Sequence, residues 1–173
     1  VDELLAEMRT SLLSRTWMGE QTRAAAIEKL DAFGVKIGYP DTWRDWSGLA
    51  IGRGSYAANR LSAARFEADR QLGRILEPVD PGEWAMPPHA VNAYFHPLRN
   101  EIVFPAGILQ PPMFDAEADD ALNYGGIGMV IAHEITHAFD LQGAQFDAHG
   151  NYADWWTASD EAAFDSRNEA VVQ

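Results

Sequence analysis

The 173-residue chain contains no cysteine. Neither a disulfide framework nor a thiolate zinc site is possible within it, so any bound metal must use histidine and carboxylate ligands. The absence of cysteine does not fix the cellular compartment, because an exported bacterial protein can fold without disulfides.

Basic residues are also scarce. The chain has 13 lysines and arginines against 26 aspartates and glutamates, which gives a formal net charge of −13. Nucleic acids and anionic membrane surfaces bind clustered positive charge, so we expect neither as a partner. No stretch approaches the roughly 18 consecutive apolar residues of a transmembrane helix. Val1 is neither an initiator methionine nor the start of a signal peptide, which predicts a mature or excised N-terminus.

The composition is otherwise that of a globular protein, since 47% of the residues are hydrophobic. Apolar residues at helical or alternating spacing predict helices over residues 2–14, 20–33, 55–76, 121–141 and 160–171, and a β-hairpin from residues 91–95 and 101–104. This set of elements predicts an α+β fold that is mostly α-helical. Residues 78–88 include four prolines and mark the best boundary between a helical part and a catalytic part.

Histidine is rare, with five residues, but two of them fall in the motif His133-Glu134-Ile135-Thr136-His137. Four residues at about 100° each place His137 within about 40° of His133, one turn along a helix. Both rings can therefore hold one Zn²⁺ at about 2.0–2.1 Å. Glu134 lies where a carboxylate can act on the attacking water without being a metal ligand. The motif thus predicts a zinc hydrolase.

A pair of structural histidines on an ordinary amphipathic helix is the alternative reading of this motif. Chance would supply the pattern roughly 0.01 times in a chain of this composition, which favours the metal site. Asp140 follows His137 by three residues and His133 by seven, so it shares their helical face. Its carboxylate can accept the outer N–H of a ligand imidazole, which fixes the tautomer and orientation of the ring. A plain helix-end carboxylate is the alternative for Asp140.

The sequences that flank the motif resemble the neprilysin / endothelin-converting enzyme family of zinc metallopeptidases. The longest matching stretches are Asn92–Phe95, Asn100–Pro112, Ala121–Gly128, Ala138–Asp140, Phe146-Asp147, Gly150-Asn151 and Trp155–Thr157. Shorter ones earlier in the chain are Trp17-Met18, Lys29-Leu30, Ile37–Pro40 and Pro78–Asp80. The resemblance therefore covers nearly the whole chain, and the lack of cysteine looks more like a bacterial member than a disulfide-rich animal ectodomain.

The resemblance implies a thermolysin-like zinc peptidase lobe that faces a second, helical lobe. Residues 1–80 would be a helical segment from the second lobe or its connection, and residues 81–173 the N-terminal part of the catalytic domain. The implied substrates are oligopeptides, and the implied location is extracellular or periplasmic.

The resemblance also implies roles for individual residues. His133 and His137 would be zinc ligands and Glu134 the general base. Asn92 and Ala93 match the family's substrate-holding edge strand, whose backbone pairs with an extended peptide as an added strand.

A catalytic zinc of this type needs three protein ligands and an open position. In the resembling family the third ligand is the Glu of a downstream Glu-Asn-x-x-Asp motif, which is not among the 36 residues after His137. Glu161 is a candidate for a substitute third ligand, because it and Asp165 show a similar Glu-x-x-x-Asp spacing. However, the match to the family at Trp155–Thr157 makes Glu161 a surface helix residue. We therefore expect the third ligand beyond residue 173, in a missing C-terminal part of the catalytic domain.

Two functions follow from these observations. In the first, the full-length parent is a zinc metalloendopeptidase with Glu134 as general base. In the second, the piece is catalytically incomplete and acts at most as a peptide-binding or structural module. A helical scaffold with an accidental motif is a third reading, which the matching flanks disfavour.

Overall fold

The computed structural model describes the backbone of residues 1–172 and the side chains of residues 1–170. The chain forms two compact units. One consists of residues 1–39 and 84–173, and the other of residues 40–83. The assignment of residues 1–80 and 81–173 to two lobes of a larger fold stays a prediction.

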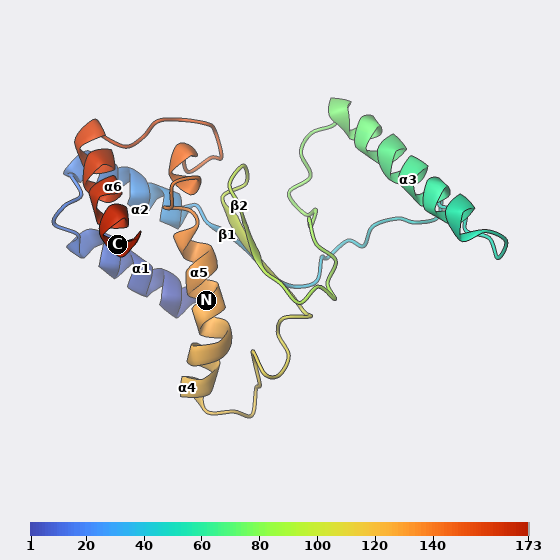
Figure 1. Cartoon of the computed structure of the whole chain (residues 1–173), viewed down its shortest axis with the longest axis horizontal. Coiled ribbons are helices and arrows are strands. Elements are labelled where there is room, and N and C mark those ends of the chain that lie inside the picture. The colour runs from blue at the N-terminus through green and yellow to red at the C-terminus, as the bar shows by residue number, and fades with distance from the viewer. Residues whose placement is uncertain (173) are drawn as a thin grey trace. The chain divides into compact units, whose positions relative to one another are not determined.

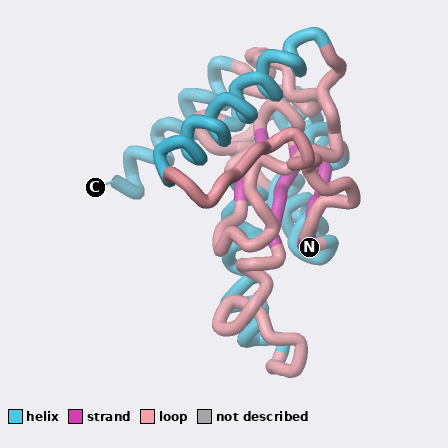
Figure 2. The backbone as a smooth tube through the Cα atoms, turned by 90° about the vertical axis from the view of Figure 1, so that its right-hand side faces the viewer, coloured by secondary structure: helices cyan, strands magenta, loops and turns pink. Residues whose placement is uncertain are grey.

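The larger unit contains most of the helices and all the strands of the described residues (Figure 1). Its elements are α1 (Asp2–Ser14), α2 (Glu20–Asp31), β1 (Gly34–Gly38), β2 (Tyr94–His96), β3 (Glu101–Pro105), α4 (Asp120–Asn123), α5 (Met129–Thr136) and α6 (Ala158–Val172). Figure 2 shows that the strands are a small part of the backbone beside helices and loops. The expectation of a mostly helical α+β fold is confirmed.

The three strands form one sheet in the order β1-β3-β2. β3 lies in the centre and is buried along its whole length, parallel to β1 and antiparallel to β2. β2 and β3 form the expected hairpin, with Tyr94 opposite Val103. Within the described chain, β2 pairs with β3 alone and so forms one edge of the sheet. This edge is the one that carries Asn92 and Ala93 just before the strand begins.

The core joins β3 to the helix that carries the metal motif. Ile127, Ile131 and Ile135 recur every four residues, and all three are buried against a cluster that includes Ile102 and Phe104 of β3. Residues at i and i+4 share one face of a helix, so this apolar stripe fixes which face points into the core. α5 lies between α1 and the strands (Figure 1), with its histidines on a different side from the isoleucines.

The segment before α5 differs from the single helix that the sequence predicts. Residues Tyr124–Gly128 form a π-helical turn between α4 and α5. At its centre a Cβ on Gly126 would lie 2.4 Å from the carbonyl oxygen of Met113, and the Ile127 amide donates a hydrogen bond to the same oxygen at 2.8 Å. A glycine is needed here because the backbone of another segment approaches closely. Turns of this kind often occur inside helices at functional sites.

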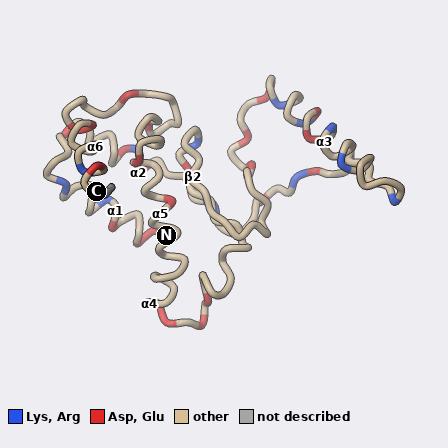
Figure 3. The backbone as a smooth tube through the Cα atoms, viewed as in Figure 1, with Lys and Arg blue, Asp and Glu red and all other residues tan. Residues whose placement is uncertain are grey.

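The smaller unit is built around α3 (Tyr56–Gly73). Ser55 caps the helix as expected, because its Oγ accepts a hydrogen bond from the Ala58 amide at 3.3 Å. Basic and acidic residues both occur along this helix (Figure 3). Arg70 pairs with Glu67 at 2.6 Å and with Glu83 at 2.9 Å. Arg70 therefore takes part in local ion pairs with acidic residues of the same unit.

In the described part of the chain, no helix combines the length and the hydropathy that crossing a membrane requires.

Candidate metal centre

The two histidines of the motif converge on one point. Their Nε2 atoms lie 3.0 Å apart, and the two rings meet edge to face with centroids 4.5 Å apart. Two nitrogens that share a tetrahedral zinc at about 2.0–2.1 Å are about 3.3 Å apart. The observed separation is close to that value, so the pair fits two ligands of a single zinc ion.

Asp140 binds the outer nitrogen of one of these rings. The Nδ1 atom of His137 lies 2.6 Å from Oδ2 of Asp140. A carboxylate at this nitrogen favours the Nδ1–H tautomer and leaves the Nε2 lone pair free for a metal. The other oxygen, Oδ1, accepts hydrogen bonds from the amides of Gln142 at 2.9 Å and Gly143 at 2.8 Å. Asp140 is therefore held from both sides.

These hydrogen bonds also set the charge of Asp140. Burial alone would raise the pKa of its carboxyl group. The Gly143 amide, the His137 ring and the Gln142 amide donate hydrogen bonds that lower the pKa below its usual range. Asp140 is thus a carboxylate at neutral pH, as an acceptor for a ligand imidazole should be.

Glu134 lies between the two histidines in sequence and its side chain is buried, with 7% exposure. It lines a cleft of about 390 Å³ together with His133 and His137. Asn92 and Ala93 line the same cleft. Asp140 lines it as well, so the structure brings together all six residues to which the sequence assigns a role. The edge of the sheet lies on one side of the cleft and the motif helix on the other.

Asn92 and Ala93 precede β2 directly. Asn92 is exposed and Ala93 is buried. β2 uses only one of its edges for pairing within the described residues. A free strand edge beside a cleft is the geometry that accepts an extended peptide as an additional strand.

A third protein ligand is not found in the described residues. They contain no group of three or more histidine, aspartate and glutamate side chains that could hold a metal ion. Glu161 is exposed on α6 and lines a separate cavity of about 280 Å³. The described residues therefore meet the three-ligand requirement of a catalytic zinc only in part.

The surroundings of the site include Lys29, to which the sequence reasoning above gives no role. Its side chain has 1% exposure, and Nζ donates hydrogen bonds to the carbonyl oxygens of Gly143 at 2.6 Å and Phe146 at 2.5 Å. One signal was available, because Lys29 shares the apolar face of α2 with Ala26 and Leu30. A lysine on a buried stripe needs acceptors within reach.

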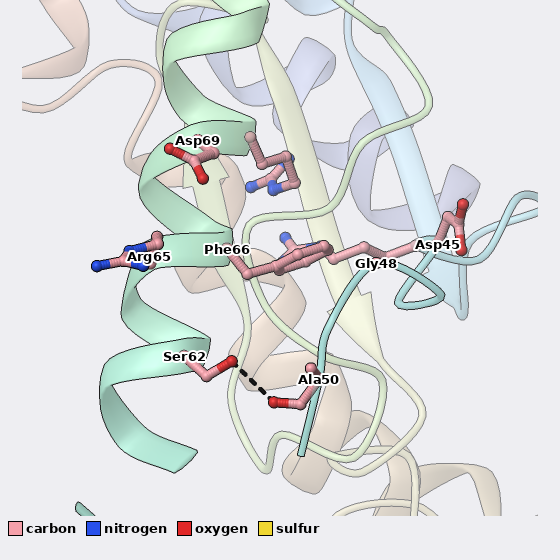
Figure 4. A pocket seen from close by; sticks show the side chains of 9 residues that line it. Asp45, Gly48, Ala50, Ser62, Arg65, Phe66 and Asp69 are labelled. Carbon is pink, nitrogen blue, oxygen red and sulfur yellow. Dashed lines mark hydrogen bonds between the residues drawn. The ribbon is translucent and has the colours of Figure 1, made fainter. Parts of the chain in front are cut away.

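The smaller unit has a cavity of its own, of about 590 Å³ (Figure 4). It lies between α3 and residues 44–50. The ring of Phe66 points at Gly48, and Ser62 Oγ donates a hydrogen bond to the Ala50 carbonyl at 2.8 Å. Arg44 pairs with Glu67 at 3.3 Å. These contacts attach the loop to the helix.

Two sequence profiles described as peptidase family M13 match this chain, one over residues 92–173 and the other over residues 1–40. The chain is 42% identical over 173 residues to the neutral endopeptidase of Lactococcus lactis subsp. cremoris, covering 99% of this chain and 28% of that protein. It is 39% identical over 184 residues to neprilysin of Homo sapiens, covering 99% of this chain and 24% of that protein. The chain spans about a quarter of the length of these curated relatives.

Solved structures agree with these matches. The zinc metalloprotease Zmp1 of Mycobacterium tuberculosis, in complex with an inhibitor, is 51% identical with a TM-score of 0.94, covering 98% of this chain and 26% of that one. PepO from Lactobacillus rhamnosis HN001 is 40% identical with a TM-score of 0.86, covering 98% of this chain and 27% of that one.

Proposed function

This chain belongs to peptidase family M13, and from that premise we propose that it forms the zinc-binding half of the catalytic centre of a metalloendopeptidase. The observation that carries the proposal is the convergence of His133 and His137, whose Nε2 atoms lie 3.0 Å apart on the wall of a cleft. The full-length parent protein supplies the third ligand from a segment beyond residue 173.

In this function His133 and His137 hold the zinc. When bound, zinc polarises the carbonyl of the scissile peptide bond and makes water a stronger nucleophile at neutral pH. Glu134 is the general base, which takes a proton from the attacking water and passes it to the leaving nitrogen. Its burial beside the histidines keeps the carboxylate at the cleft and away from bulk water.

Asp140 is the residue that orients His137. Its hydrogen bond at 2.6 Å keeps the proton on Nδ1 and directs Nε2 into the cleft. The two amides on its other oxygen stop the carboxylate from turning away.

The substrate is an oligopeptide held in an extended conformation. Asn92 and the backbone at Ala93 form the edge to which the peptide adds as a strand, and the cleft between this edge and the motif helix receives its side chains. A hydrophobic residue after the scissile bond follows from the resemblance to neprilysin, as does action outside the cytoplasm.

The experiment that tests this function uses the full-length parent protein. Glu134→Gln should keep one equivalent of zinc after dialysis and lose peptide cleavage by at least about 100-fold, because a glutamine cannot take the proton. The matched control is Glu161→Gln, an exposed residue on α6 that should leave both zinc content and cleavage unchanged. Full cleavage by the Glu134→Gln variant would exclude this role.

A second candidate function is favoured by the incomplete ligand set of the described residues. In it the 173-residue piece is catalytically incomplete and serves at most as a peptide-binding or structural module. Zinc content after dialysis and a chelator-sensitive cleavage assay on the piece alone distinguish the two. Tight equimolar zinc together with cleavage by the piece would refute this second function.

A further inference from the structure

One buried cation lies behind the metal centre. Lys29 comes from α2, which is more than 100 residues before the motif in sequence, yet its Nζ reaches the turn that follows α5. There it donates hydrogen bonds to the carbonyl oxygens of Gly143 and Phe146. A buried ammonium group that binds two carbonyls is held in one position.

The turn that Lys29 binds is the same turn that holds Asp140. Gly143 gives its carbonyl oxygen to Lys29 and its amide to Oδ1 of Asp140 at 2.8 Å. Oδ2 of the same aspartate binds Nδ1 of His137 at 2.6 Å. Three hydrogen bonds, linked through the backbone of Gly143 and the carboxylate of Asp140, therefore connect the Lys29 ammonium to a candidate zinc ligand.

This turn has no room to shift toward the helix. A Cβ on Gly143 would lie 1.8 Å from the carbonyl oxygen of His137 and 2.7 Å from the carbonyl carbon of Ala138. The glycine backbone is thus packed directly on the end of the motif helix. The carbonyl oxygen of this same glycine accepts the hydrogen bond from Lys29.

The same cation also lies over an aromatic ring of the edge strand β2. Nζ lies 5.8 Å from the centre of the Phe95 ring, which belongs to β2, and 5.7 Å from the centre of the Trp155 ring. Cations are attracted to aromatic rings at such distances. The Lys29 backbone carbonyl accepts a hydrogen bond from Nδ2 of Asn100 at 2.8 Å, which ties the end of α2 to the hairpin.

We propose that Lys29 is a positioning residue of the metal centre: its ammonium group holds the turn at Gly143, and this turn holds Asp140 against His137. The inference rests on the proposed zinc site and adds to it a residue from α2. Lys29 does not touch substrate or metal. It acts through the orientation of one ligand imidazole.

Two negative charges support the ammonium form. Burial lowers the pKa of Lys29 to about 8, while the carboxylates of Asp147 and Asp140 oppose that shift. The side chain is therefore mostly charged at neutral pH. A charge kept in the interior at this cost needs strong acceptors, and the two carbonyls supply them.

The test uses the full-length parent protein and the substitution Lys29→Met, which keeps most of the apolar stem of the side chain and removes the ammonium group. Zinc affinity is measured by competition with a chelator, and the ligand geometry by the visible absorption spectrum of the cobalt-substituted protein. We expect zinc affinity to fall by about 10-fold or more, as is typical when the support of a ligand is lost. The cobalt bands should shift, and kcat should fall more than KM rises.

The matched control is Asp160→Asn, a buried polar residue near the other end of α2. Its Oδ1 accepts a hydrogen bond from the Gly19 amide at 3.0 Å. The Asp160→Asn variant should have a lower unfolding temperature but an unchanged zinc affinity and cobalt spectrum. This control separates a general loss of stability from a loss of positioning.

Unchanged zinc affinity and an unchanged cobalt spectrum in Lys29→Met would overturn the inference, even if the unfolding temperature falls. If Lys29→Met does not fold, Lys29→Gln takes its place, because it is polar but too short to reach both carbonyls and lacks the charge. The same losses are expected of it, and their absence is equally decisive. A wild-type protein that binds no zinc would instead refute the proposed function.

Discussion

The ring of His137 and the carboxylate of Asp140 are joined by a hydrogen bond of 2.6 Å just beyond the last turn of α5. α5 ends at Thr136, so Asp140 lies in the turn that follows the helix, and its orientation depends on that turn. The amides of Gln142 and Gly143 supply this dependence, since both donate to the second carboxylate oxygen. The orientation of the His137 ring therefore depends on residues that lie outside the motif helix.

Asp140→Asn should weaken zinc binding. The amide side chain keeps an oxygen acceptor but loses the negative charge that favours the Nδ1–H form of the His137 ring. Changes of this kind typically cost about 10–100-fold in metal affinity, and chelator competition on the parent protein measures the loss. Asp115→Asn is the control, because Asp115 also accepts a backbone hydrogen bond, from the Glu117 amide at 3.0 Å. Equal zinc affinities in the two variants would show that Asp140 does not support the site.

Two neighbouring glycines should respond differently to the same substitution. A Cβ on Gly126 would lie 2.4 Å from the Met113 carbonyl oxygen, whereas nothing lies within 4 Å of a Cβ on Gly125. Gly126→Ala should therefore lower the free energy of unfolding by about 1–3 kcal/mol or more. Gly125→Ala should be neutral or raise it by up to about 1 kcal/mol. Denaturant unfolding of both variants checks this, and similar losses in the two would contradict the close approach at Gly126.

The parts of the fold that the sequence predicts correctly are those that rest on local periodicity. The helices near residues 2–14 and 20–31 and the hairpin at Tyr94 and Glu101 follow from spacing and turn residues alone. The convergence of His133 and His137 is likewise a property of one helical turn. These features need no knowledge of distant residues.

The parts that sequence reasoning missed depend on partners far along the chain. β1 forms because Val35 and Ile37 pair in parallel with Ile102 and Phe104, more than 60 residues away. A parallel pair of strands requires a long connection, so no turn sequence between neighbouring strands predicts it. Likewise, the sequence marks Gly126 as unusual but does not show that the Met113 backbone is the neighbour that requires it.

Lys29 should make the stability of the protein depend on pH. Its pKa is about 8 in the folded chain, because burial disfavours the charge, and about 10.4 when unfolded. Between these values the unfolded state binds more protons than the folded state. The free energy of unfolding therefore rises with pH in this window, by up to roughly 3 kcal/mol in total.

Lys29→Met removes this contribution. Denaturant unfolding is measured for the parent protein and the variant at several pH values between about 7 and 10. The free energy of unfolding should rise more steeply with pH in the wild type than in the variant. Groups common to both proteins cancel in the comparison. Parallel pH profiles would show that Lys29 keeps an ordinary pKa in the folded protein.

Asn92 should affect substrate binding more than the chemical step. It is exposed at the cleft wall, directly before the edge strand β2, where a side-chain amide can bind the backbone of an added peptide strand. A hydrogen bond of this kind contributes about 0.5–1.5 kcal/mol. Asn92→Ala should therefore raise KM for an oligopeptide by up to about 10-fold and change kcat little, as initial rates on the parent protein will measure. Leu98→Ala alters an exposed side chain of the same hairpin and should change neither value. A fall in kcat at constant KM would instead place Asn92 in the chemistry and remove it from the substrate-holding edge.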